Sequence, residues 1–523
     1  MTGVQTCALP ICAEGKDSDT AAVSTITGSG VYNIVGDIRA ADGGILTLDL
    51  AEGSRFEGKA VLDSGNDSQS TLTMAKNSLW TLTGNSQLNS LQNEQSVIDM
   101  TGDNKAFSTL SVETLTGNGG TIIMDIDGSQ VDASDKIYVT GDFSGSQTLS
   151  LKEINGLDSD PGIGQAAENT VLASVNGSGT FTADDQEGTL YWQRYELGQK
   201  DSAASGYTTD WYLKGITNLN LPTTSVEAIA ASGALAYHTW RDHDQLLQRL
   251  GDLRQHGREE EGVWVRVKGG KLSRSDQFEF ENKYTQYELG YDQKLKSTPA
   301  YTRYAGISFS YLDGDSSYSS GSGENKVKAL NIYGTQIGAK GHYLDLVLKY
   351  SQLDNDFKVF DTSGNKITGD YDQNGLSISA EYGRKNNLKN NWYIEPQAQL
   401  TFGRLRGTDY TTSNGIRVDQ DGIDSFVGRI GFNIGKDINE KTNIYLKANL
   451  MHEFGGGYNA SMVDASGTKA RLDRDFDDTW FEYGLGAAVQ TGKNNYFYVD
   501  VERSAGSDYK KDWQWNVGAR WSF

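Results

Sequence analysis

The chain has 523 residues, which is too long for one ordinary domain and predicts two or more independently folded parts. Its formal net charge of -22 argues against nucleic-acid binding, because a protein that tracks phosphates needs clustered Lys and Arg. A composition of 61 Gly, 27 Tyr, 17 Phe and 10 Trp with only 5 Pro favours strands and tight turns, and it predicts an all-β protein.

The N-terminal segment, residues 1–20, is predicted to be artefactual or disordered. Both cysteines of the chain, Cys7 and Cys12, lie in it, so neither a disulfide framework nor a cysteine-based metal site is expected in the rest. The segment has no basic residue before Lys16 and only a short apolar run, which makes it a poor signal peptide. It resembles a translated sequencing-adapter artefact, in which case the natural export signal and further upstream chain are missing.

A repeat follows in residues 21–105. Short clusters of β-branched residues and Leu, separated by Gly, Asn, Asp and Ser, recur about every 25 residues, as the coils of a solenoid do. These clusters begin with 45–50 and 71–74, and the pattern continues at 96–100 and 121–126. One coil cannot bury its apolar face alone, and stacking on its neighbours supplies the core. We therefore predict a right-handed parallel β-helix, with a β-sandwich of short strands as the alternative.

Residues 106–217 are predicted to cap this β-helix. The strands lengthen here and aromatic residues appear, as at 189–197 and 210–215. The open end of a solenoid would expose unpaired N–H and C=O groups, so it needs a capping module. Hairpins built from these longer strands would supply it.

An α-helical linker is predicted in residues 218–256. Pro222 sits at a helix start, and the helical pattern runs to about residue 254. The first half is built from small residues such as Ala228 and Ala231, and the second half is amphipathic, with Trp240 among its apolar positions. A helix that is slim and then polar on one face suits a narrow hydrated pore. An ordinary linker helix packed on a globular surface is the alternative.

A hydrophobic period of two marks the rest of the chain, residues 257–523. In the last segment Trp513, Trp521 and Phe523 alternate with polar residues such as Gln514 and Arg520. Counting such runs gives about twelve strands, many of about ten residues, which is long enough to cross a bilayer when tilted. Strand length and aromatic residues at strand ends favour a transmembrane antiparallel barrel over a soluble sandwich.

The connections between these strands predict the orientation of the barrel. Short turns at 385–391 and 491–494 alternate with long polar loops at 313–325, 355–370 and 455–478. An even number of antiparallel strands places both ends of the barrel on the side of the short turns, which is the periplasm. The linker helix must then pass through the pore to put the residues before it outside. A secretion function follows from this topology.

Two sets of side chains are predicted to serve that function. The pore-threading helix would present Ala228, Ala231, Leu235 and Trp240. Charges facing the lumen would hydrate the pore and contact the helix. They are Arg266, Lys268, Glu288, Asp345, Lys349, Glu395, Arg429, Glu482 and Arg520.

Several short motifs carry a family resemblance. They are Leu-Gly-Asp-Leu-Arg at 250–254, Leu-Asp-Asn-Asp-Phe-Lys-Val at 353–359, Glu-Pro-Gln-Ala at 395–398 within 392–400, Gly-Arg-Ile-Gly at 428–431, and a C-terminal Phe523. With them, the chain from about residue 106 to 523 resembles the pertactin-like branch of the classical (type Va) autotransporters. The resemblance implies a twelve-stranded translocator threaded by a helix, a β-helical passenger remnant in 21–105, and an autochaperone running from 135–141 to 211–213.

The resemblance also implies a location and partners. Such proteins are monomers in the outer membrane of Gram-negative bacteria, in contact with outer-membrane lipid and lipopolysaccharide, and their passenger is exposed at the cell surface. Periplasmic chaperones and the barrel-assembly machinery insert the barrel, and the last strand, here Trp521 and Phe523, is the signal. The passenger binds a ligand on a host or neighbouring cell in adhesin or virulence roles. Some members cleave the passenger between two adjacent Asn, but this sequence has Asn218-Leu219-Asn220, so no cleavage residue is assigned.

An outer-membrane barrel enzyme, such as a hydrolase, and a porin are the alternative functions. The sequence has no Gly-x-Ser-x-Gly motif, and Ser316 in Gly-Asp-Ser-Ser has no plausible His partner nearby. His238 and His243 are five residues apart on the predicted helix and so face different ways, which argues against a metal pair. A porin has no use for the helix or the β-helix. We expect no catalytic residue, metal or cofactor.

Overall fold

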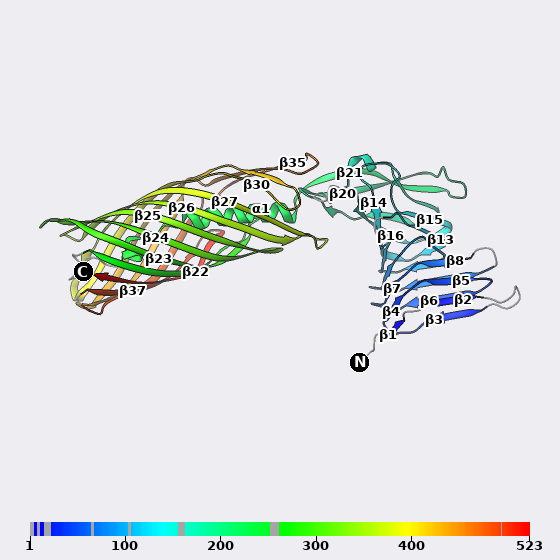
Figure 1. Ribbon diagram of the computed structural model, residues 1–523, viewed down its shortest axis with the longest axis horizontal. Helices are drawn as coiled ribbons and strands as arrows, with labels where there is room; N and C mark the ends of the chain where they lie inside the picture. Colours follow the sequence, from blue (N-terminus) through cyan, green and yellow to red (C-terminus); the bar gives the residue numbers. More distant parts are fainter. Residues whose placement is uncertain are drawn as a thin grey trace. The chain divides into compact units, whose positions relative to one another are not determined.

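The computed structural model of the protein describes residues 5–7, 11–14, 22–63, 67–102, 106–154, 163–250, 261–492 and 494–523. The chain forms two compact units, Met1–Leu221 and Pro222–Phe523 (Figure 1). Of the predicted N-terminal segment 1–20, only β1 (Gln5–Cys7) and β2 (Ile11–Glu14) fall within the described residues. None of the helices described is both long and apolar enough to cross a membrane.

The first unit is a β-solenoid whose stacked strands pair in parallel. One sheet contains β1, β4 (Tyr32–Val35), β7 (Arg55–Glu57), β10 (Leu79–Thr81), β12 (Val97–Asp99), β14 (Asn118–Ile126), β16 (Ser146–Glu153) and β18 (Thr180–Ala183). The parallel part of a second sheet contains β3 (Val23–Ile26), β6 (Ile45–Leu50), β9 (Gln69–Met74), β11 (Ser86–Asn93), β13 (Thr109–Thr116), β15 (Lys136–Phe143) and β17 (Val171–Gly177). A third contains β2, β5 (Ile38–Ala41) and β8 (Ala60–Leu62). Parallel pairing confirms the solenoid and excludes the sandwich.

Leucine ladders form the core of the solenoid. Leu72 on β9 pairs in register with Leu48 on β6 and with Leu91 on β11, and Leu91 pairs in turn with Leu115 on β13. All four side chains are buried, with at most 1% of their surface exposed. Each coil therefore buries its apolar residues against the coils on either side, as the repeat in the sequence predicts.

Antiparallel strands cover the last parallel strand of the second sheet. They are β21 (Thr209–Pro222), which pairs with β17, followed by β20 (Tyr191–Asp201) and β19 (Gln186–Glu187). A 3-10 helix, η1 (Gln165–Ala167), precedes β17. Trp211 on β21 packs edge-on against Phe181 at 5.6 Å between ring centroids. The strand edge that would otherwise be open is paired, as a capping module requires.

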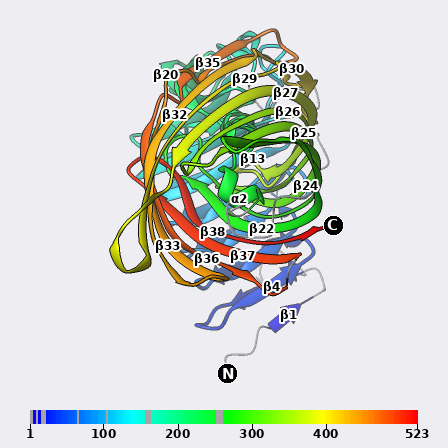
Figure 2. The same cartoon turned by 90° about the vertical axis from the view of Figure 1, so that its left-hand side faces the viewer.

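The second unit is a closed antiparallel barrel (Figure 2). Its long strands are β22 (Gly262–Arg274), β23 (Phe280–Ser297), β24 (Tyr301–Tyr318), β25 (Gly321–Gly338), β26 (His342–Phe360), β27 (Lys366–Arg384), β29 (Trp392–Leu405), β32 (Ile423–Asn439), β33 (Thr442–Glu453), β36 (Thr479–Gln490), β37 (Asn495–Ala505) and β38 (Tyr509–Ser522). The sheet has 13 strands when the two-residue β28 (Asn386–Asn387) is counted, which leaves the predicted twelve. Pairing of β22 with β38 and of β27 with β29 closes the ring.

The two faces of the barrel wall differ in chemistry. On β26, Leu344, Leu346 and Leu348 are 39–46% exposed on the outside, whereas Asp345 between them is 2% exposed inside. Leu376 on β27 is exposed on the outside in the same way, and apolar residues on the other strands repeat this contrast between an apolar outer face and a polar inner face. A wide apolar belt on the outside and charge on the inside are the signature of a barrel whose outer face meets lipid.

The long polar loops predicted between strands are instead extended β-hairpins. Strands β24 and β25 continue to Tyr318 and Gly321 and pair through Asp315 and Glu324. Strands β26 and β27 likewise extend to residues 360 and 366. The outward face of these extensions is polar, as at Asp354 and Lys358, and the buried inward face mixes apolar residues such as Phe357 with polar ones such as Asn355, so the sequence resembles that of loops. Four further short strands, β30 (Thr408–Thr411), β31 (Arg417–Gln420), β34 (Gly457–Val463) and β35 (Lys469–Asp475), form a small sheet at the same end.

The predicted continuous helix is interrupted. Helix α1 (Thr224–Arg241) ends at Asp242, whose backbone is extended with φ -67 and ψ 115, and α2 (Leu246–Leu250) follows. Residues 251–256 of the predicted linker lie outside the described residues. The break has a physical cause, because the carboxylates of Asp242 and Asp244 pair with cations of the barrel wall.

Candidate functional site: the helix-filled lumen

Helix α1 lies inside the ring of strands (Figure 1). Thr223 caps its first turn, because its hydroxyl accepts a hydrogen bond from the Val226 amide at 3.4 Å. Almost every side chain of α1 is buried, on all sides of the helix. A helix without an exposed face must be enclosed all round, which the barrel wall does here.

Small side chains let the helix fit so narrow a space. A methyl group placed on Gly233 would lie 2.6 Å from the hydroxyl oxygen of Tyr458, which reaches in from β34. Nearer the end of α1 the glycine is on the wall instead. A methyl group placed on Gly375 of β27 would lie 2.0 Å from Nε1 of Trp240. Glycine therefore stands on the helix where the wall is bulky and on the wall where the helix is bulky.

Hydroxyl and amide groups hold the first turns of α1. Asn414, in the connection between β30 and β31, donates from Nδ2 to the Ser225 hydroxyl at 2.9 Å. Ser232 shares a hydrogen bond of 2.8 Å with the Tyr371 hydroxyl of β27. Both contacts lie toward the hairpin end of the barrel, so α1 begins at that end.

Aromatic and cationic side chains surround the last turn of α1. The ring of His238 stacks on Tyr509 of β38, with centroids 4.3 Å apart, and its Nε2 accepts a hydrogen bond from Arg274 at 3.0 Å. Arg241 lies over the Trp480 ring at 4.6 Å and 3.6 Å from Glu453. A guanidinium between an aromatic face and a carboxylate is strongly held when water is excluded.

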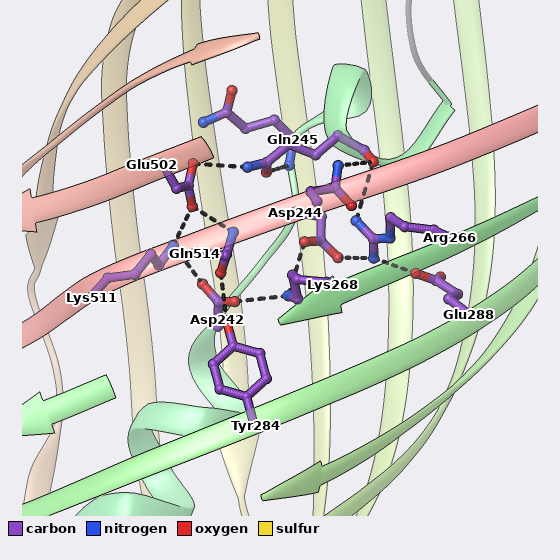
Figure 3. Close-up of polar contacts among 12 residues, drawn as sticks. Asp242, Asp244, Gln245, Arg266, Lys268, Tyr284, Glu288, Glu502, Lys511 and Gln514 are labelled. Carbon is purple, nitrogen blue, oxygen red and sulfur yellow. Dashed lines mark hydrogen bonds and ion pairs between the residues drawn. The ribbon is translucent and has the colours of Figure 1, made fainter. Parts of the chain in front are cut away.

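A polar cluster forms where the helix breaks (Figure 3). Asp242 pairs with Lys268 at 3.0 Å and with Lys511 at 3.3 Å. Asp244 pairs with Arg266 at 2.5 Å and with Lys268 at 3.2 Å. Two carboxylates of the linker thus meet three cations from the neighbouring strands β22 and β38.

The cluster continues along the inner face of the barrel wall, on neighbouring strands. Lys511 also binds Glu502 at 2.6 Å and lies 3.4 Å from Glu482, and Arg266 pairs with Glu288. Buried charges of both signs are therefore matched across three or more strands. Such an arrangement adds little net stability over apolar packing, but removal of a single partner is costly, so it specifies one position for the linker.

Helix α2 is held by the opposite side of the wall as well. Glu381 of β27 accepts a hydrogen bond from the Leu246 amide at 2.8 Å. Arg249 donates to both carboxylate oxygens of Asp345 at 2.7 and 2.9 Å. The Tyr498 hydroxyl donates to the Arg249 carbonyl oxygen at 2.6 Å. Together with the cluster, these bonds tie the linker to strands on several sides of the lumen.

The residues chosen from the sequence for the lumen all lie in it. Ala228, Ala231, Leu235 and Trp240 are on α1 and are at most 3% exposed. The predicted wall charges that are buried are Arg266, Lys268, Glu288, Asp345, Glu395, Arg429, Glu482 and Arg520. Lys349 is partly buried and donates to the carbonyl oxygen of Asp242 at 3.2 Å. The structure brings Arg266, Lys268, Glu288 and Glu482 into or beside the cluster, whereas Glu395 and Arg429 lie elsewhere on the wall.

Sequence reasoning missed the partners that complete the cluster. Asp242 and Asp244 read as the polar face of a helix, and Lys511 and Glu502 stood unremarked among many alternating positions. One local signal was available, since Glu502 falls at an inward position of a clear alternating strand. The pairing across β37, β38 and the linker has no local signature.

The proposed assembly signal lies on the outer face. Trp521 and Phe523 are 40% and 62% exposed, and the Trp521 ring packs edge-on with Phe497 of β37 at 6.5 Å. The Phe523 amide donates to the Glu261 carbonyl oxygen at 3.1 Å, so the C-terminus adjoins the start of β22 at the short-turn end. Among the described residues no three His, Cys, Asp or Glu side chains are grouped as metal ligands.

Two family models match the chain. The one described as Autotransporter beta-domain matches residues 263–502, and the one described as Pertactin matches residues 88–215. The first covers the barrel and the second covers the later solenoid coils with their antiparallel cap.

Curated relatives span both regions. The probable autotransporter YcgV of Escherichia coli is 28% identical over 97% of this chain and 56% of its own length. The pertactin autotransporter of Bordetella bronchiseptica is 28% identical over 93% of this chain and 56% of its own. The chain thus spans about half the length of these relatives. The serine protease pet autotransporter of Escherichia coli is 26% identical over 87% of this chain and 34% of its own length.

Among solved structures, the β domain of the Bordetella autotransporter Brka is 27% identical and covers 50% of this chain and 99% of its own, with a TM-score of 0.42. The two family matches fall on the barrel and on the later solenoid coils with their cap. The chain is a pertactin-like autotransporter of the outer membrane, with a β-barrel translocator and a β-solenoid passenger exposed at the cell surface.

Proposed function

We propose that the barrel secretes the passenger and then anchors it, with α1 left in the pore as a plug. The observation that carries this proposal is the enclosure of α1 within the closed ring of strands. The helix starts beside Asn414 at the hairpin end, whereas Phe523 adjoins Glu261 at the short-turn end. Chain that precedes α1 therefore leaves the lumen at the hairpin end, away from the end where the barrel strands begin and finish.

Stacking of solenoid coils outside the membrane could drive the transport without nucleotide hydrolysis. A newly emerged coil buries leucines such as Leu72 against its neighbours, and full burial of one such side chain is worth about 1.5–3 kcal/mol. In this proposal the passenger emerges C-terminus first, and residues 106–217 act as the autochaperone on which the coils of 21–105 are added.

The partners follow from the same proposal. Trp521 and Phe523 would be read by the barrel-assembly machinery after periplasmic chaperones deliver the chain, and the finished barrel would be a monomer surrounded by lipid and lipopolysaccharide. The passenger would bind a ligand on a host or neighbouring cell, in an adhesin or virulence role. The single closed ring supports a monomer, because one chain supplies every strand.

We also propose that the part of the protein in this chain is not an enzyme. The Ser316 hydroxyl donates to the Tyr318 hydroxyl at 3.2 Å within the hairpin of β24 and β25, so it is engaged with a group that is no base. Relatives include proteins named as serine proteases, so the proposal is limited to the residues of this chain.

Pore conductance tests the plug. We expect the full chain in planar lipid bilayers to conduct little, and a variant that lacks residues 224–250 to conduct as an open pore. The deletion variant must keep the heat-modifiable mobility of a folded barrel, which serves as the control. Equal conductance of the two folded proteins would contradict the plug.

A further inference from the structure

An apolar groove crosses the outer face of the barrel. It lies over β32, β33, β36, β37 and β38, and its lining includes Phe432, Leu446, Tyr483, Leu485, Val501 and Trp513. These six side chains are 43–58% exposed although all are apolar or aromatic. Ala448 lies among them, and its small side chain leaves room between its larger neighbours. In a bilayer such a groove is filled by acyl chain.

Arg503 stands at one end of this groove. It lines the groove with Tyr483 and Trp513, and it pairs in register with Tyr483 on β36. Within the described part of the chain its guanidinium has no hydrogen bond or ion pair. Asp512, a carboxylate on the neighbouring strand β38, is engaged with Lys271 at 3.6 Å instead. A charged group without a partner at the edge of an apolar surface requires one from its surroundings.

The end at which Arg503 lies faces the cell exterior. Strand β37 runs from Asn495, at the short-turn end, to Ala505 at the hairpin end, and Arg503 is two residues before its last. Tyr483 and Trp513 beside it are the residue types that mark the boundary between hydrocarbon and headgroups. The guanidinium thus lies at headgroup level, and the groove runs from it toward the middle of the wall, where Leu485 lies.

We propose that this groove, with Arg503 at its upper end, binds a lipid A molecule, the phosphorylated and multiply acylated anchor of lipopolysaccharide. The guanidinium fork matches the oxygens of a phosphate and binds them in a bidentate manner, while the groove takes an acyl chain. A multiply acylated lipid fits a groove that spans five strands better than a single chain does. The site rests on the contact with lipopolysaccharide proposed above, and it does not depend on secretion or on the plug.

Arg404 provides a matched comparison on the same face of the wall. It also points outward near the hairpin end, two residues above the 57% exposed Phe402. Its guanidinium is already engaged by both carboxylate oxygens of Asp424, at 2.8 and 2.9 Å. The positive charge of Arg404 is therefore already balanced by a carboxylate, which would repel a phosphate. Its removal controls for the loss of an exposed arginine.

Lipid retention by the full chain tests the site. The folded protein in detergent is incubated with hexa-acylated bisphosphoryl lipid A, with the same lipid after dephosphorylation, or with phosphatidylglycerol, and the bound lipid is counted by native mass spectrometry. We expect R503A to retain about tenfold less bisphosphoryl lipid A than the parent protein, as the loss of a charge-assisted bond predicts. R404A should retain as much as the parent, and the dephosphorylated lipid should not distinguish R503A from the parent.

A second variant tests the groove without touching the charge. Ala448→Phe fills it and is expected to lower lipid A retention severalfold, whereas Ala398→Phe, on the outer face of β29, should not. Heat-modifiable mobility verifies that each variant is folded. Equal retention by R503A and the parent would overturn the site. Equal retention of phosphatidylglycerol and lipid A by the parent would overturn lipid A as the occupant.

Discussion

Lys511 binds three carboxylates inside the barrel, and only one of them belongs to the linker. Asp242, Glu482 and Glu502 lie 2.6–3.4 Å from its ammonium nitrogen, and the lysine side chain is 4% exposed. The alternation along the last strand would place it on the outer face with Trp513, but a register shift between the two residues turns Lys511 inward. Glu502 reaches it within the hairpin of β37 and β38, whereas Asp242 lies 269 residues away in the sequence and could not be predicted as its partner.

Removal of this ammonium group should be costly. Lys511→Met leaves three buried carboxylates without their shared cation, so we expect the barrel to lose about 3 kcal/mol of stability, measured by denaturant unfolding in detergent. Arg404→Met, which breaks an exposed pair with Asp424, should change stability by about 1 kcal/mol or less. Equal losses in the two variants would show that the cluster does not hold the linker.

The two C-terminal aromatic residues are predicted to direct insertion. Trp521→Ala together with Phe523→Ala should reduce the amount of heat-modifiable barrel in the outer-membrane fraction severalfold, because the assembly machinery is proposed to read them. Phe309, 54% exposed on the outside of β24, is the control, and Phe309→Ala should insert normally. Undiminished insertion of the double variant would remove the assembly signal from the account.

At the scale of elements, the sequence predicted what is local and periodic. The solenoid repeat at 45–50 and 71–74 and the alternation of Leu344, Asp345 and Leu346 are set by neighbouring residues, so both appear in the structure as predicted. The break between α1 and α2 was missed, because Asp242 fits a helix pattern and leaves the helix only for partners on the wall. The extended hairpins were missed because their outward face is polar, unlike the apolar outward face of the membrane belt, and their buried face mixes polar with apolar residues.

The width of α1 is the property of that element most open to test. Gly233→Val should clash with the Tyr458 hydroxyl and cost about 1–3 kcal/mol of stability, as overpacking does, so the compact barrel band should be lost at a lower temperature. Tyr458→Ala in the same protein should restore most of that loss, since the clash and its relief involve one pair of residues. Additive losses in the double variant would place Gly233 against something else.

The solenoid depends on its ladders in the same way. Leu72→Ala should destabilise the passenger by about 2–5 kcal/mol, because it opens a cavity between neighbouring coils. Thr71, the adjacent partly exposed residue, is the control, and Thr71→Ala should have little effect. Protease sensitivity of the displayed passenger measures the difference, and similar digestion of the two variants would contradict the stacked core.

The whole molecule joins a surface-exposed solenoid to a membrane barrel through a helix that fills the pore. Each unit is stable for a different reason, since the solenoid buries leucine between coils and the barrel exposes it to lipid. The linker is the part on which secretion and anchoring both depend.

Protease treatment of intact cells tests whether the barrel displays the passenger outside the cell. The chain is expressed with a cleavable secretion signal and an epitope tag inserted at Gly206, in the turn between β20 and β21 where the glycine has open space around it. We predict that added protease removes the tag from intact cells while the barrel of residues 222–523 stays folded in the membrane fraction. A tag that is protected in intact cells and lost only after the outer membrane is permeabilised would contradict the account.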